Sequence, residues 1–224
     1  MASELPAYPF DTFTCHLREM SAVPLSDATL AALYAHYQEL RRWNRRLSLI
    51  GPGTAGEVLS RHYGESLAAL PWLRPEDQVL VDVGSGAGFP GFVLAAARPG
   101  LEVYLVESRE RKWSFLKSAV RRAEAAQAEQ GAASSALSCR CINARIERSL
   151  PPALPAGIDI VTSRAAGLSP DVLGTFVEHS PQVRFFLWQG ARRWLPFGFE
   201  VLKLHKLSYS QQRWLVEIGP EAAA

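Results

Sequence analysis

The sequence contains little cysteine, no long apolar run and almost no net charge. Its three cysteines, Cys15, Cys139 and Cys141, are an odd number, and no second pair accompanies Cys139 and Cys141. We therefore favour core or solvated thiols over a metal or redox role, and we expect no metal site and a reducing, cytoplasmic location. No apolar run approaches the roughly 20 residues that a membrane span requires. The first residues, MASELPAYPFDTF, lack the basic and apolar regions of a secretion signal, so we expect no membrane association.

The charge is nearly balanced over the whole chain but is unevenly distributed along it. The net charge of +2 does not by itself indicate a nucleic-acid-binding protein. Residues 41–46 nevertheless place four arginines in six positions, and Arg109, Arg111 and Lys112 form a second basic patch. Local patches of this kind fit either a polyanionic partner or solvated helix faces.

The first part of the chain, residues 1–75, has a helical pattern. Apolar residues recur with helical spacing after Ser26, which is a candidate N-cap. A break is expected at residues 51–56 and a second helix over residues 57–70. This part is too small to bury much surface by itself, so we expect it to form a helical cap docked on residues 76–224.

From residue 79 onward, short apolar strands alternate with amphipathic segments. This alternation predicts a parallel sheet with helices on both faces, beginning near Pro90, Arg109 and Leu168. The expected strands cover residues 79–83, 101–107, 136–142, 158–164 and 183–189.

The end of the chain departs from the parallel pattern. Residues 199–207 and 212–219 both read as strands, and only four residues, SYSQ, separate them. So short a link permits a hairpin but not a parallel crossover. A mostly parallel, seven-stranded sheet finished by an antiparallel strand is the Rossmann-like class I methyltransferase arrangement. The sequence therefore predicts an α/β class I methyltransferase fold with a small N-terminal helical cap.

Residues 81–91, VDVGSGAGFPG, contain two overlapping glycine patterns. The dinucleotide fingerprint G-x-G-x-x-G occurs literally at Gly86, Gly88 and Gly91. In a dinucleotide-binding fold, however, the first glycine follows the strand directly, and here that residue is Gly84. Counting from Gly84 fails, because the third glycine position holds Phe89. The pattern led by Asp82 fits the strand end and favours S-adenosylmethionine, while the literal match leaves an NAD-dependent oxidoreductase as an alternative.

The residues around this loop have specific expected roles. Gly84 and Gly86 allow the backbone to approach a ligand closely, and Pro90 suits the first turn of the following helix. Glu107 closes the second strand, where an acid can accept both ribose hydroxyls of an adenosine. Asp82 either contacts the ligand or orients loop amides, and Phe89 either lines the site or packs into the core.

Several motifs together resemble the glucose-inhibited division protein B (GidB) family, the guanine-N7 methyltransferases of small-subunit ribosomal RNA. The likeness covers roughly residues 30–190, and its central motif, VDVGSGAGFPG, has Ser85 where the family has threonine. The other matching motifs are Trp43-Asn44, Arg61-His62 with Ser66, Glu107-Ser108, the basic segment from Lys112 to Leu116, and Ser163-Arg164-Ala165.

The resemblance implies S-adenosylmethionine as methyl donor and N7 of a guanine in 16S rRNA, in the 30S subunit, as acceptor. It places Ile146 and Glu147 beside the adenine and Arg164 at the end of the site. The candidate cofactor-binding residues are Asp82, Gly84, Gly86, Phe89, Glu107, Ile146, Glu147 and Arg164. The candidate RNA-binding residues are Arg42, Arg45, Arg109, Lys112, Arg145 and Arg164. We expect a monomer.

One departure from the family concerns the acceptor side. Family members commonly end the fifth strand with a Leu-Lys-Gly-like step, whereas this chain has Trp188-Gln189-Gly190. The missing lysine raises the alternative of a non-catalytic rRNA-binding or assembly factor that retains the cofactor pocket. Trp188 is expected in the core, although an indole at a strand end can also stack on a flipped base.

The proposed reaction requires no general base, because guanine N7 offers a lone pair and carries no proton. Proximity and alignment are expected to supply most of the catalysis. We therefore predict no catalytic acid or base. For His62 we favour a structural or solvated role, although the helical cap can bring it near the site.

Overall fold

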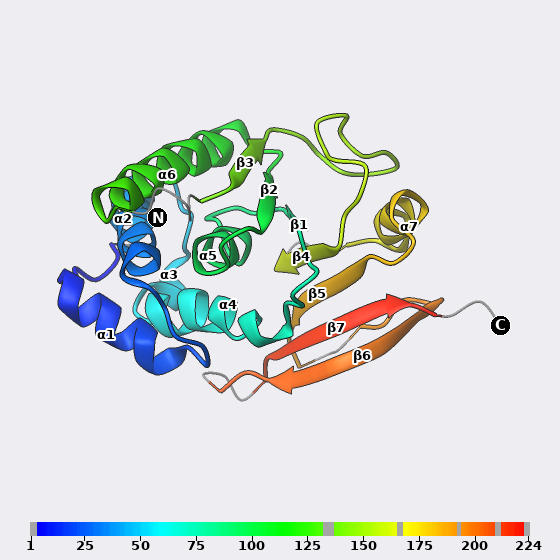
Figure 1. The fold of residues 1–224 in the computed structure, drawn as a ribbon, viewed down its shortest axis with the longest axis horizontal. Coiled ribbons are helices and arrows are strands. Elements are labelled where there is room, and N and C mark those ends of the chain that lie inside the picture. The colour runs from blue at the N-terminus through cyan, green and yellow to red at the C-terminus, as the bar shows by residue number, and fades with distance from the viewer. Residues whose placement is uncertain (1–3, 132–136, 165–167, 192–193, 209–211, 222–224) are drawn as a thin grey trace.

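The chain folds around one mixed β-sheet that separates two layers of covering segments (Figure 1). A computed structural model describes residues 4–131, 137–164, 168–191, 194–208 and 212–221. Within these residues, seven strands form a sheet with the order β3-β2-β1-β4-β5-β7-β6. The strands are β1 (Val79–Val83), β2 (Glu102–Val106), β3 (Cys139–Ile142), β4 (Ile160–Arg164), β5 (Arg184–Gln189), β6 (Phe199–Lys206) and β7 (Trp214–Pro220).

The strand directions confirm the predicted class I methyltransferase arrangement. Strands β1 to β5 are parallel, and β7 is antiparallel to both of its neighbours, β5 and β6. The link between β6 and β7 is too short to cross over the sheet, which accounts for the reversal. Every predicted strand is present, although several begin later than the apolar pattern suggested.

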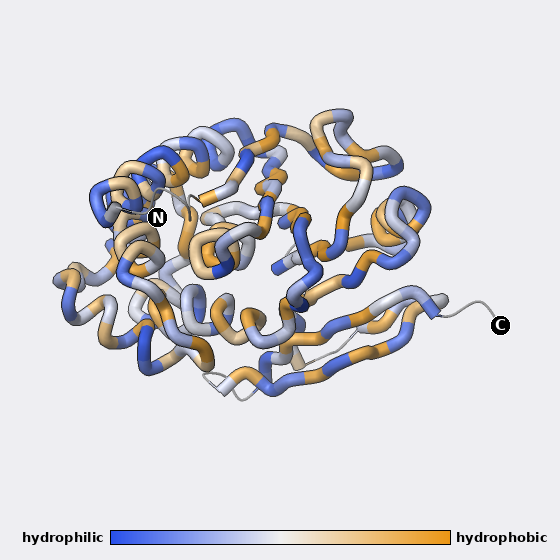
Figure 2. The backbone as a smooth tube through the Cα atoms, in the orientation of Figure 1, coloured by the Kyte–Doolittle hydropathy of each residue, from blue (hydrophilic) through white to orange (hydrophobic). Residues whose placement is uncertain are grey.

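Helices cover both faces of the sheet (Figure 1). α5 (Gly91–Ala97) and α6 (Glu110–Glu129) lie on one face with the N-terminal helices, and α7 (Pro170–His179) lies on the other. α5 is the innermost helix: six of its seven residues are buried, and Figure 2 shows it as mostly hydrophobic. Since α5 follows the glycine loop, the buried helix anchors that loop against the sheet.

Strand residues alternate between two cores, as the period of a β-strand requires. The first core lies under α5 and α6, and the second lies under α7. Leu80, Val103, Leu105, Ile160 and Phe186 belong to the first core, and Val81, Tyr104, Val106, Val161 and Phe185 belong to the second.

The N-terminal part is helical, as predicted, but its second half is irregular. Its helices are α1 (Phe10–Met20), α2 (Asp27–Asn44), α3 (Pro52–Ala55) and α4 (Glu65–Leu67). The Ser26 hydroxyl accepts a hydrogen bond from the N–H of Thr29 (3.1 Å), which confirms the predicted N-cap of α2.

The regular helix predicted over residues 57–70 is wrong. A wide π-type turn covers Leu59–Gly64, α4 follows it directly, and a 3₁₀ turn covers Leu70–Trp72. The predicted break at residues 51–56 also contains α3. A π-type turn holds one more residue than an α-helical turn. The spacing of apolar residues does not reveal this difference, because contacts with distant parts of the chain decide which side chains are buried here.

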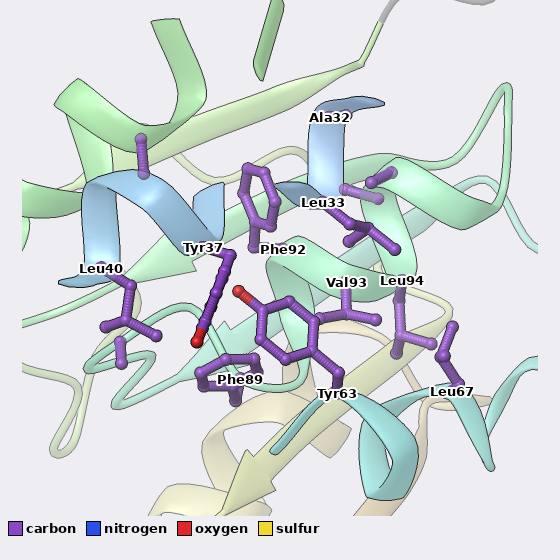
Figure 3. Close-up of a cluster of buried hydrophobic side chains, with 14 of the residues drawn as sticks. Ala32, Leu33, Tyr37, Leu40, Tyr63, Leu67, Phe89, Phe92, Val93 and Leu94 are labelled. Carbon is purple, nitrogen blue, oxygen red and sulfur yellow. The ribbon is translucent and has the colours of Figure 1, made fainter. Parts of the chain in front are cut away.

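The N-terminal helices and the sheet share the first core. Tyr37 of α2 and Tyr63 of the wide turn lie beside Phe89 and Phe92 in one cluster (Figure 3). The division of the chain at residue 75 therefore remains a prediction, since the packing continues across it.

The edge strand β6 is the most exposed part of the sheet. Val201, Leu202 and Leu204 are 40–47% exposed, and Lys203 and Lys206 interrupt the apolar positions. Lysines on an edge strand discourage pairing with another sheet. None of the helices in the described parts of the chain is long and apolar enough to span a membrane.

Candidate functional site

A cavity of about 410 Å³, here called the strand-end cavity, opens at the carboxyl ends of β1, β2 and β4. Ligands of open α/β folds bind at this end of the strands. The glycine loop follows β1, Glu107 follows β2, and Arg164 ends β4. The lining residues are Leu49, Ile50, His62, Gly84, Ser85, Gly86, Ala87, Phe89, Glu107, Ser108, Arg109, Lys112, Arg145 and Arg164.

The loop after β1 turns immediately at the strand end. Gly84 and Gly86 have φ angles of 72° and 56°, a left-handed conformation that glycine adopts without a steric penalty. The N–H groups of Gly84 and Ser85 both donate to the carbonyl of Val106 on β2 (2.9 and 3.1 Å). Gly84 is therefore the turn glycine, and the literal dinucleotide fingerprint starts two residues too late.

Gly91, the last glycine of that literal fingerprint, has a role that the sequence analysis did not assign. A Cβ atom on Gly91 would lie 2.5 Å from the Cβ of Asp82 and 2.7 Å from Cδ2 of Leu105. The first turn of α5 therefore packs closely on β1 and β2 only because Gly91 has no side chain. Pro90, predicted in the first turn of this helix, instead occupies the position before it.

Glu107 connects β2 to the glycine loop and faces the cavity. It is 5% exposed. Its Oε2 accepts a hydrogen bond from the N–H of Gly86 (3.0 Å), and its Oε1 accepts one from the N–H of Arg109 (2.8 Å). A carboxylate has about four lone-pair sites, so these two bonds fix its orientation and leave capacity for hydroxyl groups of a ligand.

Asp82 lies behind the loop, is completely buried, and does not line the cavity. Its Oδ1 accepts a hydrogen bond from the hydroxyl of Thr162 on β4 (2.6 Å), and its main-chain carbonyl accepts one from the hydroxyl of Ser85 (2.8 Å). Burial raises the pKa of Asp82 to about 6, and the bond from Thr162 opposes the shift only in part. The placement favours the alternative in which Asp82 holds the loop, and direct contact of Asp82 with a ligand stays a prediction.

A buried carboxylate beside the cavity, Glu65, is shared by three arginines. Its Oε2 lies 3.0 Å from Nη2 of Arg164 and 3.1 Å from Nη2 of Arg213, and its Oε1 lies 3.5 Å from Nε of Arg61. Arg164 also donates to the carbonyl of Arg61. Burial lowers the pKa of Arg164 to about 10, although Glu65 partly offsets this shift. Nη1 of Arg164 is buried without a hydrogen-bond partner within the described residues, so the cluster retains positive charge and a free donor.

His62 and Phe89 form the wall of the cavity on the side of the N-terminal part. Their rings lie 5.1 Å apart, and Phe89 is also buried in the first core. Phe89 thus both lines the cavity and packs into the core, and its contact with a cofactor stays a prediction. Burial, followed by the charges of Arg164, Arg61 and Arg213, lowers the pKa of His62 to about 2. His62 is thus a neutral side chain of the cavity wall rather than a solvated one.

His36 of α2 is a buried link to the glycine loop that the sequence analysis did not single out. Burial lowers the pKa of His36 to about 4, so the ring is neutral at physiological pH. Nε2 lies 2.9 Å from the carbonyl of Ala87, and Nδ1 lies 2.6 Å from the hydroxyl of Tyr63. Because a carbonyl only accepts, Nε2 carries the proton and Nδ1 accepts from Tyr63. The ring stacks on Phe92, and a Cβ on Gly88 would lie only 3.1 Å from Nε2.

The predicted RNA-binding residues divide between two places. Arg109, Lys112, Arg145 and Arg164 line the strand-end cavity. Arg42 and Arg45 line a separate cavity of about 610 Å³, here called the arginine cavity. The lining residues of the arginine cavity are Arg42, Trp43, Arg45, Arg46, Leu47 and Arg111.

Three other predicted positions lie away from the strand-end cavity. Ile146 is buried in the second core, and the exposed Glu147 faces Arg145 at 3.7 Å. Trp188 is buried and donates its indole N–H to the carbonyl of Glu65 (2.9 Å), so the idea that it stacks on a base is wrong. Ala165 of the Ser-Arg-Ala motif lies outside the described residues.

Gln189, which stands where the family has lysine, braces a turn. Its Nε2 donates to the carbonyl of Trp194, and its Oε1 accepts from the N–H of Trp194, both at 2.8 Å. The side chain therefore has a structural function here and lies outside the lining of the strand-end cavity.

The comparisons with known proteins agree with this geometry. The family model described as "GidB: rRNA small subunit methyltransferase G" matches residues 29–193. The chain belongs to the GidB family. Among solved structures, the glycopeptide N-methyltransferase MtfA complexed with S-adenosyl-L-methionine aligns with a TM-score of 0.54 at 12% identity, over 76% of this chain and 99% of that one. At so low an identity this likeness shows the fold alone.

Relatives named "Ribosomal RNA small subunit methyltransferase G" align with part of this chain. The relative from Paramagnetospirillum magneticum is 36% identical over 155 residues, 69% of this chain and 67% of the relative. The relative from Desulfotalea psychrophila is 46% identical over 90 residues, 40% of this chain and 41% of the relative. The aligned region thus spans between about two fifths and two thirds of the length of these relatives.

Proposed function

We propose that this member of the GidB family is an S-adenosylmethionine-dependent methyltransferase that modifies N7 of a guanine in 16S rRNA of the small ribosomal subunit. The observation that carries the proposal is the position of the glycine loop, in which Glu107 accepts a hydrogen bond from the N–H of Gly86 at the cavity. The printed name of the relatives supports the reaction class. We further propose that the protein acts in the cytoplasm as a monomer.

The residues of the strand-end cavity fit a methyl donor that carries an adenosine and a charged amino-acid group. The free lone pairs of Glu107 suit ribose hydroxyls, and the left-handed glycines let the backbone approach the ligand closely. The buried Nη1 of Arg164, which has no hydrogen-bond partner among the described residues, suits an anionic group. When bound, S-adenosylmethionine supplies an electrophilic methyl group on a sulfonium.

Methylation of guanine N7 requires that the protein align the base with the methyl group, and it requires no proton transfer. Guanine N7 has a lone pair and no proton, and the reaction leaves none to be removed. His62 is neutral in the cavity wall, so it adds no charge there. Holding the base in line with the methyl group is then the main contribution of the chain.

The basic residues at the rim of the cavity suit a polyanionic acceptor. Arg109 and Arg145 are exposed, and Lys112 is partly exposed, all on the cavity lining. Cations at these positions can contact phosphates and fix the position of the RNA, whereas selection of the base is left to the cavity.

Two measurements test the proposed function. Isothermal titration calorimetry should show binding of S-adenosylmethionine and S-adenosylhomocysteine but not of NAD, and Glu107→Ala should abolish it. Transfer of labelled methyl groups to 30S subunits, followed by mass mapping, should yield 7-methylguanosine. Preferential binding of NAD would instead establish the oxidoreductase alternative. Binding of rRNA without any methyl transfer would identify a non-catalytic assembly factor, and a different modified base would refute the guanine-N7 assignment.

A further inference from the structure

The arginine cavity is built where the end of α2 meets the first turn of α6. α2 and α6 lie side by side (Figure 1), and residues at the end of α2 and just after it line the cavity together with Arg111 of α6. Trp43 and Leu47 supply an apolar wall, while four arginines, from both sides of the junction, supply the charge. This combination of an indole and guanidinium groups distinguishes the cavity from a simple basic surface.

A buried carboxylate fixes the indole of Trp43. Glu39 is 1% exposed and accepts hydrogen bonds from the indole N–H of Trp43 (2.6 Å), from Nη2 of Arg42 (2.6 Å) and from the hydroxyl of Ser118 (2.6 Å). Nε of Arg122 lies 2.8 Å from its other oxygen. Burial raises the pKa of Glu39, but the three hydrogen bonds and the charge of Arg122 outweigh it and lower the pKa overall. The indole is thus held in place before any ligand arrives.

Two of the four arginines have no ion-pair partner among the described residues. Arg42 is bonded to Glu39, and Arg45 pairs with the exposed Glu4 at 2.8 Å. Arg46 and Arg111 are exposed and form no ion pair with any residue in the described ranges. They reach the same cavity from different segments of the chain.

The arginine cavity and the strand-end cavity share their dividing wall. Leu47 lines the arginine cavity, and Leu49, two residues further along, lines the strand-end cavity. On α6, Arg111 lines the first and Lys112 the second. Adjacent residues of the same two segments therefore line different cavities, which places the two cavities next to each other.

We propose that the arginine cavity binds a nucleotide of single-stranded RNA that neighbours the target guanine, with its base against Trp43 and its phosphate between Arg46 and Arg111. This inference rests on the proposed function, because it takes the occupant of the strand-end cavity to be a nucleotide of the same strand. Bases stack on aromatic side chains, and guanidinium groups bind the phosphates of unpaired RNA. A free phosphate would use the arginines but not the indole.

The test compares variants in their binding of a short, fluorescein-labelled, single-stranded ribo-oligonucleotide that contains guanosine. Arg46→Ala/Arg111→Ala should lower the affinity at least tenfold and reduce the slope of log affinity against log salt by about 0.7, since both arginines contact one phosphate and each neutralised phosphate of a single strand contributes about 0.7. Trp43→Leu should lower the affinity about tenfold with the slope unchanged, and Trp43→Phe should restore most of it.

The charge-matched control is Arg18→Ala/Arg98→Ala. Arg18 pairs with the exposed Asp27, Arg98 caps the end of α5, and neither lines one of these two cavities. Binding of S-adenosylmethionine should be the same in every variant, which shows that the fold and the donor site persist. Equal losses in the control and in Arg46→Ala/Arg111→Ala would overturn the inference. So would a loss seen only with whole 30S subunits, because that result assigns the cavity to a ribosomal protein.

The outcomes also separate this inference from the proposed function. If Arg46→Ala/Arg111→Ala binds the oligonucleotide normally and the protein transfers methyl groups, the proposed subsite is refuted and the proposed function stands. Specific loss of oligonucleotide binding in a protein that transfers no methyl group supports an RNA subsite and refutes the reaction.

Discussion

The strand-end cavity and the arginine cavity meet at the first turn of α6, yet they hold their polar groups in opposite ways. In the strand-end cavity, Glu107 and Arg164 are buried or nearly so and bound to the backbone or to Glu65. In the arginine cavity, Arg46 and Arg111 are exposed and form no ion pair with another described residue. The first arrangement depends on exact packing, so single changes there should have large effects. The second depends on summed charge, so changes there should be smaller and sensitive to salt.

The largest expected effect is the loss of the buried carboxylate at Glu65. Glu65→Gln leaves Arg61, Arg164 and Arg213 without their common counter-charge, and removing one partner of a buried ion pair typically costs about 3–5 kcal/mol. The measurement is urea unfolding at pH 7. Arg213→Gln is the matched comparison: two arginines still share Glu65, so it should destabilise the protein by much less. Equal costs for the two variants would mean that Glu65 does not hold the cluster together.

The next effect should come from packing under the glycine loop. Gly91→Ala places a Cβ atom under 3.0 Å from Asp82 and Leu105, and overpacking of a core typically costs about 1–3 kcal/mol. Gly174→Ala is the control, because a Cβ there meets nothing within 4 Å inside α7. It should stabilise the protein by about 0.5–1 kcal/mol. Thermal unfolding of both variants measures the contrast in sign, and a neutral Gly91→Ala would show that α5 can shift away from β1.

The strands and the loop of the candidate site show how much the sequence could predict. Local patterns located β1 and β5 to within a residue, the N-cap at Ser26, the turn at Gly84 and the acid at Glu107, because each depends on neighbours along the chain. They also predicted the antiparallel β7, since the length of a link limits its topology.

The parts that escaped prediction depend on contacts between distant residues. His36 and Ala87 are 51 positions apart, and Arg164 and Arg61 are 103 apart. The one available signal was that His36 falls on the apolar face of α2 beside Leu33 and Leu40, where a polar residue requires a buried partner. No spacing rule indicated that Glu65, rather than one of its acidic neighbours, would meet the arginines.

A third prediction concerns the proposed donor site. Glu107→Gln keeps the shape of the side chain but replaces one acceptor oxygen with a donor, so the N–H of Gly86 or of Arg109 loses its partner. Hydrogen bonds to a charged acceptor contribute about 1.5–3 kcal/mol. We therefore expect affinity for S-adenosylmethionine, measured by calorimetry, to fall about 10- to 100-fold. Glu102→Gln on the same strand is the control: Glu102 pairs with the exposed Arg140 and does not line the strand-end cavity, so the variant should bind the donor normally.

A fourth prediction uses pH to test how the N-terminal part is fastened to the loop. Burial lowers the pKa of His36 from 6.5 to about 4, so between these values the unfolded chain binds about one more proton than the folded one. Stability from His36 is fully present above pH 6.5 and is lost as pH falls towards 4, at about 1.4 kcal/mol per pH unit. His62 acts in the same direction, and Asp82, whose pKa is raised, acts in the opposite one.

His36→Gln isolates this contribution. An amide can donate to the carbonyl of Ala87 and accept from Tyr63 without titrating. The variant should be less stable than the parent at pH 7, and the difference should shrink by about 1.4 kcal/mol per pH unit between pH 6 and pH 4. Urea unfolding across this range measures it, and a constant difference would show that the imidazole is not held neutral.

The smallest effects are expected at the rim of the strand-end cavity, where the basic side chains are exposed or partly exposed, like those of the arginine cavity. Lys112 and Arg145 line the cavity, and the Arg145 side chain is 76% exposed and lies 3.7 Å from the exposed Glu147. An exposed ion pair of this kind contributes about 0–1 kcal/mol to stability. Lys112→Ala and Arg145→Ala should therefore leave the unfolding midpoint nearly unchanged and weaken RNA binding a fewfold each. Each should also reduce the salt slope by about 0.7. If either instead abolished S-adenosylmethionine binding, that residue would belong to the buried donor machinery, and the boundary between the two cavities would have to be redrawn.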